Sequence, residues 1–168
     1  MGQLERTLVV LKPDAIGRSV IGEVISRFER AGLHIVGMKM VSPDADFFKG
    51  HYEGIGQLWT RKWEDVLNRV VKDMMATPVL AMILEGVEVV QYVRKIVGPT
   101  EPKSAAPGTI RGDFAHISYA YVDNNPGASV YNLIHASADA NEAAQEIKHR
   151  FKDEELFHHE PIHKRFTR

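Results

Sequence analysis

Apolar runs separated by polar residues, glycine and proline divide most of the chain into strands and helices. Three segments are rich in consecutive apolar side chains, which is typical of buried strands: residues 7–11, 33–41 and 79–84. Three others have apolar positions at helical spacing: residues 20–31, 59–75 and 87–97. Gly32 follows the first of these helical segments as a stop signal. The hydrophobic pattern therefore predicts strands that alternate with helices.

The rest of the chain combines a long loop, a further strand and a last helix. Residues 98–113 hold three prolines and three glycines, which predicts a stiff, ordered loop of functional importance. Residues 115–122 alternate enough to predict a fourth strand, and the turn residues Asp-Asn-Asn-Pro-Gly follow. We therefore expect residues 115–131 to form a β-hairpin-like excursion. Asp139 and Glu142 have the spacing of a capping box, which predicts a helix up to Phe151.

The order of these elements predicts an α/β protein built as a two-layer α+β sandwich. Its expected topology is ferredoxin-like βαββαβ, with a four-stranded antiparallel sheet and extra helices. The sequence contains no repeat, linker or low-complexity segment, and its 168 residues suit one core. We therefore expect residues 1–168 to form a single domain.

Composition narrows the possible partners and the compartment. The formal net charge is −1, so no overall field attracts nucleic acid or an acidic membrane. The absence of cysteine excludes disulfides and thiolate catalysis and favours a reducing compartment. No apolar run resembles a signal peptide or a membrane span. We expect a soluble, cytoplasmic protein without nucleic-acid or membrane partners.

His135 is the strongest candidate for chemistry. It is surrounded by small residues, a helix start follows it, and Glu146 lies about three helical turns along. An imidazole is largely neutral at pH 7, so one ring nitrogen carries a lone pair for use as a base or nucleophile. A histidine with a packing or surface role is the simpler alternative.

Basic and hydroxyl groups at the ends of predicted elements suggest a phosphate site. Lys12, Arg94, Thr100 and Arg111 together supply the donors that a transferring phosphoryl group requires. Composition does not show whether these four side chains lie together. An equally good interpretation is that each is a separate surface residue. A phosphate-binding loop is excluded at Gly17 and Gly22, because Glu23 follows this glycine pair where such a loop needs lysine. For the C-terminal histidines, a solvent-exposed tail is favoured over a metal site.

Several longer motifs, spread from residue 7 to residue 157, resemble the nucleoside diphosphate kinase family. These motifs are Lys-Pro-Asp at 12–14, Gly-Glu-Val-Ile-Ser-Arg-Phe-Glu-Arg-Ala-Gly-Leu at 22–33, His-Tyr at 51–52, Pro-Val-Leu-Ala-Met at 78–82, Leu-Glu-Gly at 84–86, Pro-Gly-Thr-Ile-Arg-Gly-Asp-Phe at 107–114 and Asn-Leu-Ile-His-Ala-Ser at 132–137. The resemblance implies ping-pong transfer of the γ-phosphate of a nucleoside triphosphate, typically ATP, to a nucleoside diphosphate through phosphohistidine.

The resemblance also assigns roles to residues by position. It implies that His135 is the phosphorylated nucleophile and that Ser137 and Glu146 orient its ring. It implies that the following residues bind phosphates and ribose: Lys12, Tyr52, Arg94, Thr100, Arg111 and Asn132. Mg²⁺ would enter bound to the nucleotide phosphates, without a protein-only metal cage. Family members are commonly homo-oligomers, so a hexamer is favoured over a tetramer or dimer.

This chain departs from the family pattern in three places. Val66 stands where the family usually stacks a phenylalanine on the nucleobase, and nearby Trp59 or Trp63 are candidates to replace that contact. The stretches before Pro78 and before Asn132 are longer than usual. The common Gly-Ser-Asp after the nucleophile is Ala-Ser-Ala here. A catalytically weak relative that serves as an interaction or regulatory module is the alternative reading.

Overall fold

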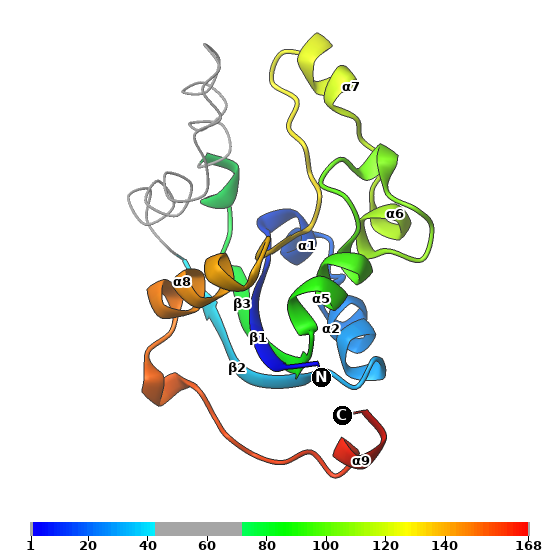
Figure 1. The fold of residues 1–168 in the computed structure, drawn as a ribbon. Helices are drawn as coiled ribbons and strands as arrows, with labels where there is room; N and C mark the ends of the chain where they lie inside the picture. The colour runs from blue at the N-terminus through cyan, green and yellow to red at the C-terminus, as the bar shows by residue number, and fades with distance from the viewer. Residues whose placement is uncertain (1, 43–71, 168) are drawn as a thin grey trace.

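Four strands form an antiparallel sheet at the centre of the computed structural model, which describes residues 2–42 and 72–167. The strands are β1 (Leu4–Leu11), β2 (His34–Val41), β3 (Val79–Val87) and β4 (Ile134–Ala136), in the order β2-β3-β1-β4. All pairs are antiparallel. The predicted ferredoxin-like α+β sandwich is confirmed, and so are its first three strands (Figure 1).

β1 occupies the middle of the sheet because both of its faces are apolar. Val9 and Leu11 pack on one face and Leu8 and Val10 on the other, and all four are buried. A strand covered on both sides has no position for an exposed polar residue, which explains its nearly continuous apolar run. Across from Val10, on the short strand β4, lies His135.

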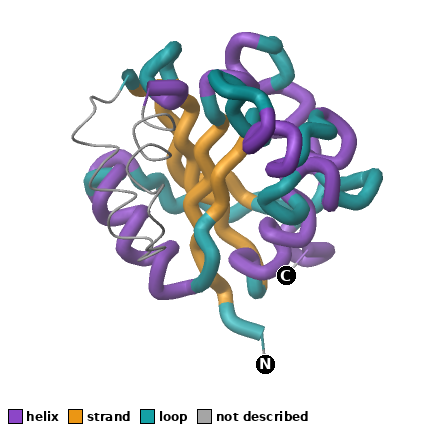
Figure 2. Tube along the Cα trace, turned by 90° about the horizontal axis from the view of Figure 1, so that it is seen from above, coloured by secondary structure: helices purple, strands orange, loops and turns teal. Residues whose placement is uncertain are grey.

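Helices cover both faces of this sheet (Figures 1 and 2). Helices α2 (Ile21–Arg30) and α5 (Val89–Val97) pack against the face of Val9 and Leu11. Helix α8 (Ala140–Arg150) packs on the opposite face, with the following Phe151 buried there. Short helices α1 (Pro13–Gly17) and α6 (Ile110–Phe114) and the 3-10 turn η1 (Pro102–Ser104) complete the region around the end of β1. No helix in the described parts of the chain is long and apolar enough to cross a membrane.

The predicted fourth strand at residues 115–122, and with it the β-hairpin-like excursion, is wrong. Residues 119–124 form helix α7 (Tyr119–Asn124), whose N-terminus is capped by the Ser118 hydroxyl accepting from the Tyr121 N–H at 3.2 Å. The alternating aromatic side chains that suggested a strand are not buried, since α7 has no buried residue. The edge of β1 that such a strand would need is instead paired with β4.

The C-terminal segment returns along the sheet after α8 and a short turn, η2 (Asp153–Glu155), and ends in α9 (Lys164–Thr167). The Phe157 N–H donates to the Val36 carbonyl at 2.7 Å. His159 Nε2 lies 2.6 Å from His34 Nε2, and His158 contacts Arg6. The terminal histidines are exposed, as expected of a tail, but two of them also fasten it to the sheet.

Candidate functional site

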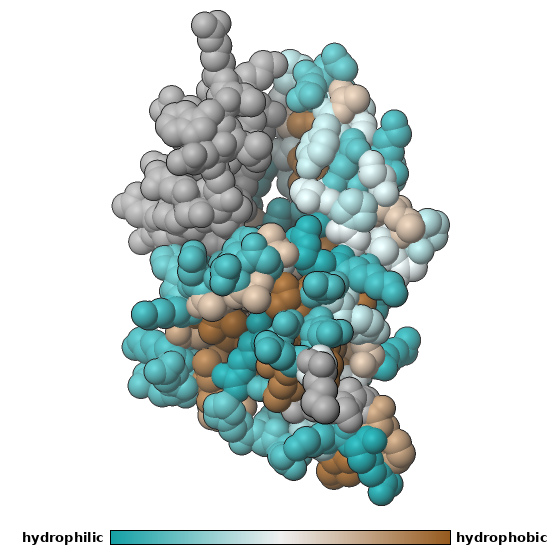
Figure 3. All heavy atoms as spheres, in the orientation of Figure 1, coloured by the Kyte–Doolittle hydropathy of each residue, from teal (hydrophilic) through white to brown (hydrophobic). Residues whose placement is uncertain are grey.

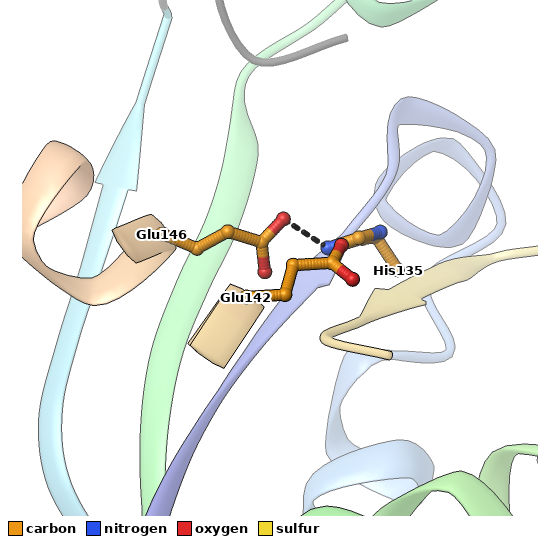
Figure 4. Close-up of side chains that lie close together, drawn as sticks. All are labelled: His135, Glu142 and Glu146. Atoms are coloured by element: carbon orange, nitrogen blue, oxygen red, sulfur yellow. Dashed lines mark hydrogen bonds and ion pairs between the residues drawn. The ribbon is translucent and has the colours of Figure 1, made fainter. Parts of the chain in front are cut away.

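His135 lies at the centre of β4 and is oriented by a buried carboxylate from α8. Its Nε2 is 2.8 Å from Glu146 Oε1, and the other oxygen of Glu146 accepts from the Ser137 hydroxyl at 2.6 Å. The tautomer that donates from Nε2 to this carboxylate carries its lone pair on Nδ1. Figure 4 shows the Glu146 carboxylate directed at the ring. If the imidazole acts as a base or nucleophile, this contact makes Nδ1 the reactive nitrogen.

Helix α8 delivers Glu146 because its start is fixed by the side chain of Asp139. One Asp139 oxygen accepts from the N–H groups of Asn141 and Glu142 at 2.8 and 2.9 Å, as an N-cap residue does. Glu146 follows two turns later, on the buried face of the helix. The predicted capping box forms only in part, because the Glu142 carboxylate accepts from Ala138 rather than from Asp139. The predicted helix itself is confirmed.

The backbone just before His135 adopts an unusual turn at Leu133, whose φ is 65°. The Ile134 N–H donates to the Asn132 carbonyl at 2.8 Å, which closes a three-residue γ-turn. Leu133 is held there from both sides: its N–H donates to Asp14 Oδ2 at 2.9 Å and its carbonyl accepts from the Lys12 N–H at 2.8 Å. A bulky residue at positive φ is strained, so the end of β1 imposes this conformation.

Lys12 and Asn132 form a polar bridge beside this turn. Lys12 Nζ donates to Asn132 Oδ1 at 2.8 Å, and the Asn132 amide donates to the Thr100 carbonyl at 2.9 Å. Burial lowers the pKa of Lys12 to about 8, and the neighbouring Arg111 contributes in the same direction. Asp14 and Asp73 act against this shift. The ammonium of Lys12 is thus poorly compensated and would gain from an anionic ligand.

Arg111 is held by three backbone carbonyls that surround it. Its Nη1 donates to Gly98 at 2.8 Å, its Nη2 to Ile134 at 2.6 Å and its Nε to Asn132 at 3.3 Å. The residue is only 5% exposed. Burial, followed by the charge of Arg94, lowers the pKa of Arg111 to about 10. The guanidinium therefore fastens the segment before His135 to the loop at Gly98.

A second arginine approaches the site from α5. Arg94 Nη1 donates to the Ala136 carbonyl at 3.3 Å. Within residues 2–42 and 72–167, no carboxylate forms an ion pair with Arg94 or Arg111. Arginine cations placed close together without carboxylate partners form a site suited to a polyanion such as a phosphate chain.

Residues 132–137 are thus the meeting point of the predicted site. Each of the following residues makes at least one contact with this segment: Lys12, Arg94, Thr100, Arg111 and Glu146, while Asn132, His135 and Ser137 belong to it. The alternative in which the basic groups are unrelated surface residues is therefore wrong. Tyr52 and Val66, together with Trp59 and Trp63, lie outside the described residues.

Two acidic residues were not anticipated in the site. Asp14 binds the N–H of Leu133, and the Glu142 carboxylate lies within 4.8 Å of both His135 and Glu146 (Figure 4). Burial is the main reason that the pKa of Glu142 is raised. The four-residue spacing of Glu142 and Glu146 on one helix was a signal for the second of these, because such residues share a face. Asp14 belongs to the Lys-Pro-Asp motif at 12–14, but the sequence assigned it no role.

His135, Glu142 and Glu146 form a group that could be considered for a metal ion. Mg²⁺ prefers six oxygen ligands in a regular octahedron. Here one ligand is a nitrogen, and both oxygens of Glu146 already bind other side chains. These residues do not fit a protein-held magnesium site, so no step of the chemistry is assigned to a metal bound by them.

Comparison with known proteins gives one consistent result. The family model described as nucleoside diphosphate kinase matches residues 5–156. A nucleoside diphosphate kinase of Borreliella burgdorferi is 46% identical over 156 residues, which cover 93% of this chain and 92% of that protein. That of Pyrococcus horikoshii is 46% identical over 158 residues, with 94% and 91% covered.

Solved structures agree with the sequence relatives. A transition-state mimic of the kinase from Borrelia burgdorferi with bound vanadate and ADP has a TM-score of 0.87 and 41% identity, and covers 98% of this chain and 96% of that one. A kinase from Halobacterium salinarum in complex with CDP has a TM-score of 0.83 and 31% identity, with 98% of each chain covered. With the family model matching from β1 to beyond α8, the chain belongs to the nucleoside diphosphate kinase family of phosphotransferases.

Proposed function

We propose that the chain transfers the γ-phosphate of a nucleoside triphosphate to a nucleoside diphosphate in two steps through phosphorylated His135. The observation that carries this proposal is the contact of Glu146 with Nε2, which directs the lone pair of Nδ1 away from the carboxylate. A histidine nucleophile divides one difficult transfer into two easier ones. The alternative of a catalytically weak interaction module predicts nucleotide binding without a covalent intermediate.

In the first step, the lone pair of Nδ1 attacks the γ-phosphorus, and the bond from phosphorus to the bridging oxygen breaks. The electron pair of that bond leaves with the nucleoside diphosphate. In the second step, a terminal oxygen of the acceptor diphosphate attacks the phosphorus, and the pair of the phosphorus–nitrogen bond returns to Nδ1. Throughout, Glu146 holds the proton on Nε2 and stabilises the positive charge of the ring, while Ser137 holds Glu146.

We propose that the cations around residues 132–137 bind the substrate. Lys12, Arg94 and Arg111 would bind the phosphates, and Thr100 and Asn132 the phosphates and ribose hydroxyls, with Tyr52 and Val66 added from the family resemblance. Mg²⁺ belongs to the nucleotide substrate, where it neutralises phosphate charge. The lack of cysteine supports a reducing compartment such as the cytoplasm.

The proposal is tested by incubating the pure protein with ATP labelled in the γ-phosphate. We expect label on the protein that is stable in base and labile in acid, as a phosphorus–nitrogen bond is, and that is removed by any nucleoside diphosphate. Absence of label, or label that survives acid, would contradict the covalent step. Nucleotide binding without label would favour the interaction module.

The pKa of Lys12 predicts a pH dependence of substrate capture. The ammonium is charged below about pH 8 and neutral above it, so kcat/KM should fall as the pH rises through this value. Bound phosphate favours the charged form, so kcat should fall only at higher pH. The variant Lys12→Arg keeps its charge and should show a lower but flat profile. A wild-type kcat/KM that stays constant up to about pH 9.5 would show that the Lys12 charge is not used.

We further propose a homo-oligomer, with the hexamer favoured by the family resemblance. Exposed apolar side chains support self-association, among them Leu4, Met38 and Met40, and apolar groups lie among hydrophilic ones in Figure 3. We also propose that the proline-rich loop at 98–113 contributes to the subunit contact. Ile110 of this loop is buried in the core of its own protomer, so exposed neighbours such as Pro107 would contact the partner. Light scattering at micromolar concentration should show an oligomer, and a stable monomer would refute it.

A further inference from the structure

The first turn of helix α8 places a second carboxylate beside His135. A carboxylate oxygen of Glu142, a carboxylate oxygen of Glu146 and a ring nitrogen of His135 all lie within 4.8 Å of one another. Figure 4 shows both carboxylates next to the ring. Glu146 holds the hydrogen bond to Nε2, at 2.8 Å. Glu142 therefore acts on the ring through its charge rather than through a hydrogen bond.

Two hydrogen bonds fix the position of Glu142. Its side chain accepts from the Ala138 N–H at 3.0 Å, which ties the carboxylate to the chain directly after residues 132–137. Its own N–H donates to the capping carboxylate of Asp139 at 2.9 Å. Side chain and backbone of Glu142 are thus both held by the segment that leads from His135 into the helix. A charge held in this way acts on the ring without a costly rearrangement during the reaction.

Two carboxylates this close together repel each other unless a positive charge compensates them. Burial is the main reason that the pKa of Glu142 is raised, and the charge of Glu146 raises it further. Among the ion pairs of residues 2–42 and 72–167, none joins Glu142 to a lysine or an arginine. The charged form of His135 acts in the opposite direction and lowers the pKa of Glu142. The pair of carboxylates is therefore arranged for a ring that carries a positive charge.

The ring gains such a charge in the proposed transfer. When Nδ1 bonds to phosphorus while Nε2 keeps its proton, the imidazole becomes positive, whereas the negative charge of the γ-phosphate is present as soon as the nucleotide binds. A negative charge beside the ring thus opposes the binding of the triphosphate and favours the step that follows. Only an interaction that is stronger in the transition state than in the bound ground state accelerates that step.

We propose that Glu142 is a positioning residue that acts through His135: its carboxylate is a second counter-charge, beside Glu146, for the positive charge that the ring gains on taking the phosphoryl group. The inference rests on the proposed function and deepens it. The bonds that form and break are those of the proposed transfer, and no proton leaves the ring. Glu142 thus raises the rate of the chemical step at the expense of some affinity for the nucleotide.

The test compares Glu142→Gln with the matched control Glu154→Gln. Glutamine keeps an oxygen that accepts from Ala138, so only the charge of Glu142 is lost. Glu154 lies beyond the other end of α8, in η2, and is 79% exposed, so the control removes the same charge outside the site. Each protein is mixed with excess γ-labelled ATP and Mg²⁺ at pH 8 and quenched in base after milliseconds. The label on the protein gives the phosphorylation rate at saturation and the ATP concentration at half-saturation.

We expect Glu142→Gln to lower the saturating rate roughly three- to tenfold and to lower the half-saturating ATP concentration roughly two- to fourfold. The melting temperature should stay that of wild type, and Glu154→Gln should match wild type in every measurement. A saturating rate of Glu142→Gln within twofold of wild type would overturn the inference. A slower rate together with weaker ATP binding or a lower melting temperature would also overturn it, because it would indicate a structural role.

The same experiment separates this inference from the proposed function. A wild type that becomes labelled, at rates that Glu142→Gln reproduces, would refute the role of Glu142 alone. A wild type that forms no phosphohistidine at all would refute the proposed function, and the role of Glu142 with it.

Discussion

The variant His135→Ala is expected to lose phosphate transfer by a factor of thousands while it remains folded. Removing the nucleophile removes the covalent path itself, so positioning by Arg94 and Arg111 cannot compensate. The fold should survive, because alanine fits a three-residue strand and Glu146 keeps its hydrogen bond from Ser137. We expect a loss of stability of about 1–2 kcal/mol from the missing contact with Glu146.

Steady-state transfer from ATP to a second diphosphate and thermal melting together check this expectation. The variant His116→Ala is the control, since it removes an exposed imidazole from the same half of the chain. It should keep full activity. Turnover of His135→Ala close to wild type would refute the assignment of the nucleophile, whereas a collapsed melting transition would mean that lost activity says nothing about chemistry.

Arg111→Met is expected to affect both stability and transfer, in contrast to Arg94→Met. Arg111 donates to the carbonyls of Gly98, Asn132 and Ile134, and the last two flank the turn before His135. The variant loses all three hydrogen bonds, and within the described residues only the Asn132 carbonyl keeps another donor, the Ile134 N–H. The loss should cost about 2–4 kcal/mol in total, which corresponds to a fall in melting temperature of about 5–10 °C. Arg94 is exposed and makes one long hydrogen bond of this kind, so its loss should cost less than about 1 kcal/mol.

Transfer should fall in both variants, because each loses a cation for the phosphates. We expect kcat/KM to decrease roughly ten- to a hundredfold in Arg94→Met and at least as much in Arg111→Met. The two measurements are thermal unfolding and initial rates with saturating donor. Equal melting temperatures for the two variants would show that the three carbonyl contacts of Arg111 do not support the fold.

The fold was predictable where a buried element is long enough to show a regular pattern of apolar residues in the sequence. β1 is apolar on both faces, and α2 repeats its apolar positions at helical spacing, so both are visible in the pattern. β4 has only three residues, too few to establish any period, and its identity as a strand depends on the free edge of β1. Residues 115–122 were misread because aromatic residues favour strands, while their actual exposure is decided by tertiary structure.

The site was predictable through motifs, and its supporting contacts were not. The resemblance identified residues that the structure gathers around the segment 132–137. It could not identify the hydrogen bond from the Leu133 N–H to Asp14, because the two residues are far apart in the chain. Such contacts depend on where the strands end in space.

The turn at Leu133 couples the position of His135 to the packing of the protein interior. The Leu133 side chain is completely buried in the same apolar cluster as Val9, Leu11 and Ile134, while its backbone is part of the turn that leads to His135. Glycine at this position would relieve the backbone but would leave a cavity of leucine size in the core. Substitutions that repack this cluster to raise thermal stability would therefore also move the backbone at His135. The core around Leu133 is thus a poor place to gain stability without loss of turnover.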